Sequence, residues 1–304
     1  MSTTKVLAID IGRSTIKSAV VERRGATFTI ADVQRTDTIS TAGDVPPRLL
    51  DLLRRRLRAE NGIAAVGIGT TGQVSTQGDV STTMSDLYRD TTPLGPWLTE
   101  ELHLPVLVRN DAQLLALGEA LYGAGRDWPV VLGLAVGSGV GGGIVRHGKL
   151  DIGSDGIAGE CGHIRVVDSD ERRSCWCGGH GCLEVQVSGP AIEDRYYGIT
   201  GANAQATEIL RSGMVDGPAA TVVGAVVQEL ATGLATLACC VNPDGIVLGG
   251  SVGVAIAPLL TTLMETMSHH VYLAVRGTKI RVAQLGVNAQ LYGAALLCEA
   301  QAAA

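Results

Sequence analysis

The residues KVLAIDIGRSTIKSAVV, positions 5–21, predict a buried β-hairpin. Residues 5–10 form a short apolar run of the kind found in strands that are covered on both faces. The polar turn 11–14 follows, and residues 16–21 form a second apolar run. The first strand therefore ends in the carboxylate of Asp10, directly before a turn that contains a glycine.

The same arrangement recurs in the second half of the chain. Residues 130–136 and 140–145 are expected to form two strands around the glycine-rich turn at 137–139. The other expected elements are helices over residues 49–57, 112–121, 219–240, 255–267 and 289–302, and strands over residues 64–68, 106–108 and 246–248. Residues 198–217 have the weakest pattern. Two copies of one series of elements predict an α/β fold of duplicated halves with a cleft between them.

The composition is typical of a globular chain with a large core. At about 150 residues per domain, 304 residues are enough for two domains or one large domain. Hydrophobic residues make up 46% and charged residues 18%, so disorder is not expected. Aromatic residues are only 3%, so Val, Leu, Ile and Ala must fill the core.

Charge and hydropathy argue against nucleic-acid and membrane partners. The net charge is -6, and the densest basic run, Arg54-Arg55-Arg56, is expected to be the solvated face of a helix. No apolar stretch approaches the ~20 uncharged residues that span a bilayer, and the first residues lack the pattern of a signal peptide. We therefore predict a cytoplasmic protein that binds neither nucleic acid nor membranes.

A cysteine cluster is the strongest chemical signal in the sequence. The segment CWCGGHGC, residues 175–182, holds Cys175, Cys177 and Cys182 among glycines that let the chain curl around an ion. In a reducing compartment such a cluster indicates a metal rather than disulfides. Zn²⁺ takes four ligands of Cys or His type, and three thiolates indicate a closed, structural site. The spacing leaves three candidates for the fourth ligand: Cys161, His163 and His180.

Two glycine turns are candidate phosphate sites. Phosphate binding needs exposed backbone N–H groups and small side chains, and Mg²⁺ needs a nearby carboxylate such as Asp10. The second turn, in GSGVGGG at 137–143, has more glycine than a pair of strands needs, which favours a close approach to a ligand. It lacks the following helix of a dinucleotide site and the Lys-Ser/Thr ending of a P-loop. The two turns together predict loops that grip one nucleotide phosphate chain.

Asn110 and Asp111 stand between a predicted strand and a predicted helix. Ligands gather at this edge of α/β sheets, and a base that accepts a hydroxyl proton during phosphoryl transfer would sit there. Both residue types are also favoured as helix N-caps. The residues alone do not choose between a cap and a base.

Two glutamates flank the cysteine segment. Glu160 lies in AGECGH at 158–163, and Glu184 follows Leu183. Two carboxylates beside a rigid metal loop can bind sugar hydroxyls, although two surface glutamates would show the same pattern.

Taken together, these residues resemble the ROK family of bacterial sugar kinases and related repressors, within the actin/hexokinase superfamily. The most specific parts are the string Cys-x-Cys-Gly-x-x-Gly-Cys-Leu-Glu at 175–184 and Ala-Gly-Glu-x-Gly-His at 158–163, and both are intact. The resemblance extends from Asp10 to the expected final helix. It implies a two-lobed, ribonuclease H-like fold. The small lobe would hold residues 1–112 and 288–304, and the large lobe would hold residues 113–287 with a zinc-binding loop at 161–184.

The resemblance also implies an activity, which is ATP-dependent phosphorylation of a hexose or amino-hexose hydroxyl, the 6-OH. Asp111 would be the general base. The implied sugar-site residues are Asn110, Glu160, His163, Glu184 and Gly72. His163 would complete the structural zinc site with Cys175, Cys177 and Cys182. One imidazole nitrogen would bind zinc while the other donates to the sugar.

On the nucleotide side, the resemblance implies Mg²⁺ bound with ATP. The implied nucleotide-site residues are Asp10, Gly12, Ser14, Thr15, Lys17, Gly137, Ser138, Gly139, Gly249 and Gly250. Asp10 would help to hold the Mg²⁺. Because relatives are often dimers or tetramers, a homodimer or homotetramer is expected.

Three places depart from the family pattern. The first turn usually reads Asp-Ile-Gly-Gly-Thr, and here Arg13 replaces the second glycine, where it could contact phosphate or block the loop. A Pro-Gly-Pro-Val turn is replaced by Thr-Gly-Gln-Val at 71–74. An Asn-bearing loop that touches sugar is replaced by residues 85–90, with Asp86 and Asp90. This acidic loop suggests an amino sugar whose ammonium group would meet one of these aspartates.

Two rival functions belong to the same family. A repressor would carry a helix-turn-helix segment ahead of Asp10, where this sequence has nine residues. A sugar-binding sensor that has lost catalysis would have Arg13 as its lesion, although Asp111 and the second glycine turn are retained. Release of ADP in the presence of a sugar separates the kinase from the sensor.

Overall fold

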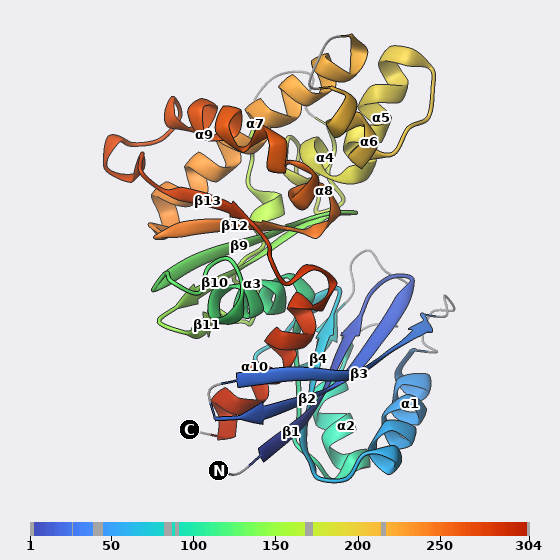
Figure 1. Ribbon diagram of the computed structural model, residues 1–304. Helices are drawn as coiled ribbons and strands as arrows, with labels where there is room; N and C mark the ends of the chain where they lie inside the picture. The colour runs from blue at the N-terminus through green and yellow to red at the C-terminus, as the bar shows by residue number, and fades with distance from the viewer. Residues whose placement is uncertain are drawn as a thin grey trace. The chain divides into compact units, whose positions relative to one another are not determined.

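The computed structural model describes residues 3–25, 27–38, 45–81, 87–88, 91–167, 173–213 and 217–302 (Figure 1). The chain forms two compact units. The first unit is made of Met1–Gly118, Lys149–Ala158 and Val287–Ala304, and the second is made of Glu119–Gly148 and Gly159–Gly286.

The first unit is centred on a five-stranded mixed sheet. Its strands are β1 (Thr3–Ile11), β2 (Thr15–Arg24), β3 (Thr27–Asp37), β4 (Ile63–Thr70) and β8 (Val106–Asn110), in the order β3-β2-β1-β4-β8. Strands β1 to β3 are antiparallel neighbours, whereas β4 and β8 run parallel to β1. The carboxyl ends of β1, β4 and β8 therefore meet at one edge. A small sheet follows β4, with strands β5 (Gln73–Val74), β6 (Val80–Ser81) and β7 (Thr91–Thr92).

Helices α1 (Val45–Ala59) and α2 (Leu94–Leu102) cover one face of this sheet, where their leucines pack on the apolar side chains of β1. The expectation of a solvated basic face on α1 was wrong for Arg56, which is 3% exposed and binds the Asp32 carboxylate and carbonyl of β3. Its position explains the burial. Arg56 continues the apolar stripe of Leu49 and Leu53 at helical spacing, so its side chain points into the protein.

Helices α3 (Asp111–Tyr122) and α10 (Ala289–Ala302) approach each other very closely. A Cβ atom at Gly293 would lie 2.0 Å from the Leu114 carbonyl oxygen, and one at Gly118 would lie 2.3 Å from the Ala289 carbonyl oxygen. Helix α10 also packs on β1 and β4, where Gly67 leaves room for the Ala294 carbonyl (Figure 1). These three glycines are therefore required by packing.

The second sheet repeats the plan of the first. Its strands are β9 (Val130–Val136), β10 (Val140–Arg146), β11 (Lys149–Asp151), β12 (Gly245–Gly249) and β13 (Lys279–Val282), in the order β11-β10-β9-β12-β13. In both sheets an antiparallel hairpin comes first, and two later strands run parallel to its first strand. The predicted α/β fold of duplicated halves is confirmed.

The helices of the second unit are α4 (Glu184–Val187), α5 (Gly189–Thr200), α6 (Ala206–Ser212), α7 (Pro218–Val241), α8 (Gly250–Ala255) and α9 (Leu260–Ser268). Helix α7 is its central helix, with Leu230 and Leu234 fully buried in the core and α9 packed alongside. Among the described helices, α7 alone combines the length and the apolar character of a membrane span, with a mean hydropathy of 1.6 and 61% of that window buried. The sequence had predicted no apolar stretch of the ~20 uncharged residues that span a bilayer.

Several elements differ from the sequence expectation. The single helix expected over 255–267 is divided into α8, the 3-10 turn η2 (Ala257–Leu259) and α9. Pro258 explains the break, because proline lacks the N–H that a continuous helix needs. Strands β3 and β13 and helix α2 were not expected. The 3-10 turns η1 (Cys161–His163), η3 (Leu273–Val275) and η4 (Gly286–Asn288) complete the described elements.

The boundaries of the two units also differ from the expected lobes. The boundary expected after residue 112 falls within α3, whereas the units divide after Gly118. Residues Lys149–Ala158 were expected in the large lobe but group with the first unit. The Gln113 side-chain amide donates to the carbonyls of Gly156 (3.0 Å) and Ala158 (2.8 Å), which ties this segment to α3.

Candidate active site and zinc site

Asp10 lies at the carboxyl end of β1 and is only 4% exposed. The antiparallel register places Lys17 opposite it on β2, and the Lys17 Nζ donates to Asp10 Oδ2 at 2.8 Å. The same ammonium group donates to the Val287 carbonyl at 3.3 Å. The hairpin thus carries a buried carboxylate that an ion pair neutralises, next to the expected phosphate turn.

The turn between β1 and β2 is closed by its own backbone. The Gly12 N–H donates to the Thr15 carbonyl at 3.0 Å, and a Cβ atom at Gly12 would lie 3.1 Å from that oxygen. Thr38 braces the turn, because its hydroxyl donates to the Gly12 carbonyl at 2.8 Å and its N–H donates to the Ser14 carbonyl at 3.0 Å. Arg13 is exposed, and its φ is not in the left-handed region. The turn therefore accommodates an arginine at position 13.

Asn110 caps helix α3. Its Oδ1 accepts the N–H groups of Ala112 (2.9 Å) and Gln113 (3.3 Å). Its side-chain amide donates to the Gly72 carbonyl at 3.0 Å, and Gly72 has a φ of 100°, which favours glycine. Asn110 thus joins the helix start to the turn after β4.

Asp111 is the first residue of α3 and is partly buried. The pKa of its carboxyl group is raised to about 7, first by burial and second by the neighbouring Asp10 carboxylate. The Ala112 N–H, which Oδ1 accepts at 2.9 Å, and Lys17 act in the opposite direction. A carboxylate whose pKa lies near neutral pH is suited to accept a proton at physiological pH.

Tyr88 lies within residues 85–90, the third departure from the family pattern, and was not among the predicted site residues. Tyr88 is 3% exposed, and its hydroxyl lies 2.8 Å from Thr70 Oγ1 at the end of β4. Burial raises the pKa of the Tyr88 hydroxyl above its usual range. Asp86 and Asp90, the expected partners of an ammonium group, lie outside the described residues.

The glycine turn of the second unit lies against two other backbone turns. The Gly137 carbonyl accepts the Gly189 N–H at 2.7 Å, where α5 begins. A Cβ atom at Gly137 would lie 3.7 Å from Ser251 Oγ, and one at Gly250 would meet the Val136 carbonyl oxygen at 2.3 Å. The two nucleotide turns expected from the sequence, 137–139 and 249–250, therefore lie together. Gly189 is a neighbour that the sequence did not predict.

A set of four side chains fits a zinc ion. One ligand atom each from His163, Cys175, Cys177 and Cys182 lie within 4.8 Å of one another. The Sγ atoms of Cys177 and Cys182 are 3.7 Å apart, and Cys175 Sγ is 3.6 Å from His163 Nδ1. Tetrahedral bonds of about 2.3 Å to sulfur and about 2.0 Å to nitrogen give separations of about 3.8 Å between two sulfur atoms and about 3.5 Å between sulfur and nitrogen.

The other two candidates for the fourth ligand lie outside this set. Cys161 is 5% exposed and packs in the core of the second unit. His180 forms an isolated β-bridge with Ser174. Because the separations match tetrahedral zinc, the donor set of one histidine and three cysteines defines the candidate metal site.

The two flanking glutamates lie beside this site. Glu160 Oε2 is 3.7 Å from His163 Nε2, the imidazole nitrogen that does not face the thiols. Burial raises the pKa of Glu160, His163 opposes this, and Glu184 adds to it. Glu184 accepts hydrogen bonds from the Val140 N–H at 2.9 Å and from the Trp176 indole at 2.6 Å. These three potential sugar ligands thus lie near one another in the second unit.

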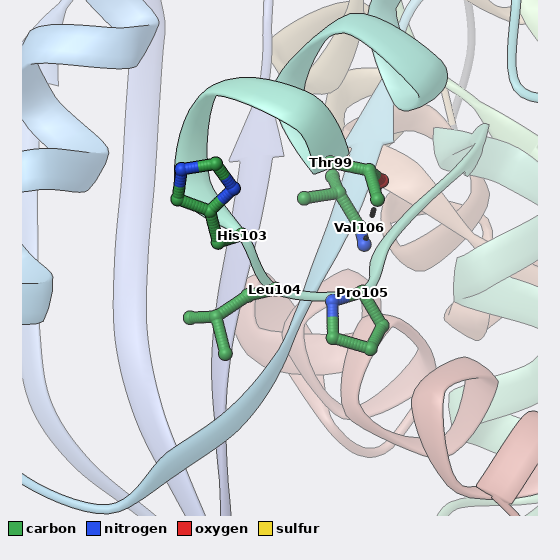
Figure 2. A pocket seen from close by; sticks show the side chains of 5 residues that line it. All are labelled: Thr99, His103, Leu104, Pro105 and Val106. Carbon is green, nitrogen blue, oxygen red and sulfur yellow. Dashed lines mark hydrogen bonds between the residues drawn. The ribbon is translucent and has the colours of Figure 1, made fainter.

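A surface hollow in the first unit is unrelated to these sites. Figure 2 shows Thr99, His103, Leu104, Pro105 and Val106 around it, at the amino end of β8. Asn110 stands at the other end of the same strand, about 13 Å away at the usual rise per residue. Ligands of α/β sheets bind at the carboxyl ends of strands, so the candidate site is at Asn110.

Both sheets share one strand order, and each has a glycine turn in its first hairpin. This organisation is that of the actin/hexokinase-type carbohydrate kinases, which are ATP-dependent enzymes, and the chain is of that class. More specifically, it belongs to the ROK family, whose family model matches residues 6–301.

Relatives of known name agree with this assignment. The chain is 32% identical to a glucokinase of Halalkalibacterium halodurans, with 99% of this chain and 97% of that kinase covered. It is 29% identical to an N-acetyl-D-glucosamine kinase of Mannheimia succiniciproducens, with 95% and 97% covered.

Two solved structures are similar over almost the whole chain. The ROK hexokinase of Thermus thermophilus has a TM-score of 0.84 at 28% identity, with 98% of this chain and 100% of that chain covered. A ROK-family transcriptional regulator, homologous to the E. coli MLC protein, has a TM-score of 0.86 at 25% identity. There, 97% of this chain and 78% of that chain are covered.

Proposed function

We propose that this kinase transfers the terminal phosphoryl group of ATP to the 6-OH of a hexose or amino-hexose. Asp111 is the general base, and a structural zinc ion shapes the sugar site. The observation that carries the proposal is the pKa of Asp111, raised to about 7 at the carboxyl end of β8.

Asn110 serves as the helix cap, which supports the role of Asp111 as the base. Asn110 caps α3 with two accepted N–H groups, so the helix does not depend on Asp111 for its cap. A carboxylate with a pKa near 7 is largely ionised at physiological pH, so it can accept a proton. It is also basic enough to keep that proton after the transfer. In the proposed reaction Asp111 accepts the proton of the attacking hydroxyl.

The second unit supplies the proposed sugar ligands. With Nδ1 facing the thiols, the Nε2 of His163 is left to donate to a sugar hydroxyl, while Glu160 and Glu184 accept from others. Zinc would fix the orientation of the imidazole and lend rigidity to the loop. Gly72 and Asn110 are proposed to contact the sugar from the first unit.

The two glycine turns are the proposed phosphate sites. Gly12, Ser14 and Thr15 offer backbone and hydroxyl groups, and the second set of turns offers Gly137, Ser138, Gly139, Gly249 and Gly250. Asp10 would help to hold Mg²⁺, which supplies positive charge to the phosphates. Lys17 already neutralises Asp10 in their ion pair and adds a second positive group beside that turn.

A second candidate is a sugar-binding regulator without catalysis. Arg13, which stands where relatives have glycine, and the similarity to a ROK-family regulator favour it. The exposed side chain and the ordinary backbone conformation of Arg13 favour the kinase, because the turn keeps its hydrogen bonds.

The test is ADP release from Mg²⁺-ATP with a panel of sugars that includes glucose, N-acetylglucosamine and free glucosamine. A kinase releases ADP with at least one sugar. Sugar binding without ADP release would favour the regulator. A higher kcat/KM for glucose than for every amino sugar would contradict the proposed ammonium contact.

The mass of the protein in solution tests the proposed homodimer or homotetramer.

Asp111→Asn tests the base directly. We expect kcat to fall by at least ~100-fold, the scale of a lost general base, while sugar binding survives. Because the neutral amide also removes the buried charge beside Asp10, the free energy of unfolding should not decrease. Unchanged turnover would refute the role of Asp111.

A further inference from the structure

Trp176 stands inside the zinc loop, between the ligands Cys175 and Cys177. Its indole Nε1 donates to Glu184 Oε1 at 2.6 Å. Its ring makes an edge-to-face contact with His163, with centroids 4.8 Å apart and planes at 82°. One side chain therefore touches two of the proposed sugar ligands while its backbone belongs to the metal loop.

The Glu184 carboxylate is held at both oxygens. Oε2 accepts the Val140 N–H at 2.9 Å, and Oε1 accepts the Trp176 indole. Gly139 leaves the necessary space, because a Cβ atom there would lie 2.7 Å from Oε2. Each carboxylate oxygen can accept a further hydrogen bond, so the fixed group can still receive a sugar hydroxyl.

The tryptophan is not demanded by metal binding. The residue between the first two cysteines is free in the Cys-x-Cys pattern of the zinc string. Trp176 is also 38% exposed, whereas a purely apolar filler of the loop would be buried. Its indole N–H meets a carboxylate, which gives a stronger hydrogen bond than a neutral acceptor.

We propose that Trp176 is a positioning residue of the sugar site, which holds Glu184 and His163 in the orientation that receives the sugar. Zinc bound to Cys175 and Cys177 would fix the backbone on both sides of Trp176. The indole, held in place in this way, restrains the Glu184 carboxylate through its hydrogen bond. This inference rests on the proposed sugar site in the second unit. It does not depend on phosphoryl transfer.

Trp176→Phe removes the N–H donor and keeps an aromatic edge for His163. We expect the Kd and KM for the sugar to rise about 3- to 10-fold, the scale of one lost charge-assisted hydrogen bond that water can partly replace. The zinc content and the KM for ATP should not change. Trp97→Phe on α2 is the matched control and should leave all four quantities unchanged.

Binding of glucose and of N-acetylglucosamine is measured by calorimetry, so the outcome is readable even if no sugar is phosphorylated. In a Glu184→Gln background, the further effect of Trp176→Phe should be less than about twofold, because the two residues act as one unit. Tryptophan fluorescence of the wild type and of Trp97→Phe should change on sugar binding.

Three results would overturn the proposal. The first is an unchanged sugar Kd in Trp176→Phe with full zinc content. The second is a loss of sugar affinity that only follows a loss of zinc, which would make Trp176 a structural part of the loop. The third is an unchanged fluorescence of Trp97→Phe at saturating sugar. This measurement keeps Trp176 in place, so it tests the proposal even if Trp176→Phe does not fold.

Discussion

Asn110 and Asp111 show how neighbouring residues with the same capping preference receive different roles. Asn110 finds two helix N–H groups and the Gly72 carbonyl, so its side chain is used for structure. The charges of Asp10 and Lys17 act on the Asp111 carboxyl group, and its pKa is raised. Of the two side chains, only the carboxyl group of Asp111 can accept a proton, and its surroundings bring its pKa near neutral pH.

The pH dependence of kcat follows from the pKa of Asp111, which is raised to about 7. Below this value the carboxyl group is protonated and cannot accept the hydroxyl proton, so kcat should fall about tenfold per pH unit. Above it the rate should level off. The measurement is kcat between pH 5 and 9 at saturating sugar and Mg²⁺-ATP.

The residual rate of Asp111→Asn is the control and should show no such inflection. A wild-type rate that stays level down to pH 5 would contradict the assignment, because a carboxylate with an ordinary pKa, or another group, would then be the base.

At the scale of elements, glycine decides how closely helices and strands approach. The crossing of α3 and α10 brings backbone atoms to distances that a methyl group would forbid, at Gly118 and at Gly293. Since α3 begins with Asp111, this crossing supports the helix that positions the proposed base. The bonds from Gln113 to the carbonyls of Gly156 and Ala158 brace the first turn of the same helix.

Gly293→Ala should destabilise the protein, because its Cβ atom would meet the Leu114 carbonyl oxygen at 2.0 Å. We expect a loss of about 2 kcal/mol or more in the free energy of unfolding, measured by urea denaturation. The matched control is Gly224→Ala on α7, where a Cβ atom meets nothing within 4 Å. There, alanine should stabilise the helix by up to about 1 kcal/mol. Equal effects of the two substitutions would contradict the close crossing.

At the scale of the whole molecule, the two units position their proposed site residues in different ways. The first unit holds its chemistry at the carboxyl ends of parallel strands, where backbone geometry alone brings Asp10 and Asn110 to one edge. The second unit holds its proposed sugar ligands in short segments outside its sheet, with His163 in η1 and Glu184 at the start of α4. A metal ion bound by His163 and the three cysteines would cross-link η1 to the cysteine segment.

Loss of zinc should therefore affect sugar binding more than ATP binding. Cys177→Ser should lower the zinc content from about one ion per chain, and should raise the KM for the sugar at least tenfold. The KM for ATP should change much less. Cys240→Ser, at an exposed cysteine of α7, is the matched control and should retain zinc and activity. Full activity of a zinc-free Cys177→Ser protein would contradict the structural role of the metal.

Much of the fold was predictable because it depends on local periodicity. Apolar runs and glycine turns predicted both hairpins, and the duplicated series predicted the two halves. Strands β3 and β13 were missed because they pair at sheet edges and carry many polar residues, so their sequences lack a continuous apolar run. The helix over 255–267 was drawn too long because Pro258 was not weighed as a break.

The sequence by itself determined the family, the α/β class, the glycine turns and three cysteines of the zinc loop, since each is written in contiguous residues. The spacing left Cys161, His163 and His180 open as the fourth ligand, the resemblance implied His163, and the tertiary structure places His163 beside the thiols. It also buried Arg56 against Asp32 and laid Trp176 on Glu184. The physical reason is that these are contacts between separate segments, whose distances depend on how loops and strands pack. Spacing along the chain sets which residues are available, and packing decides which of them meet.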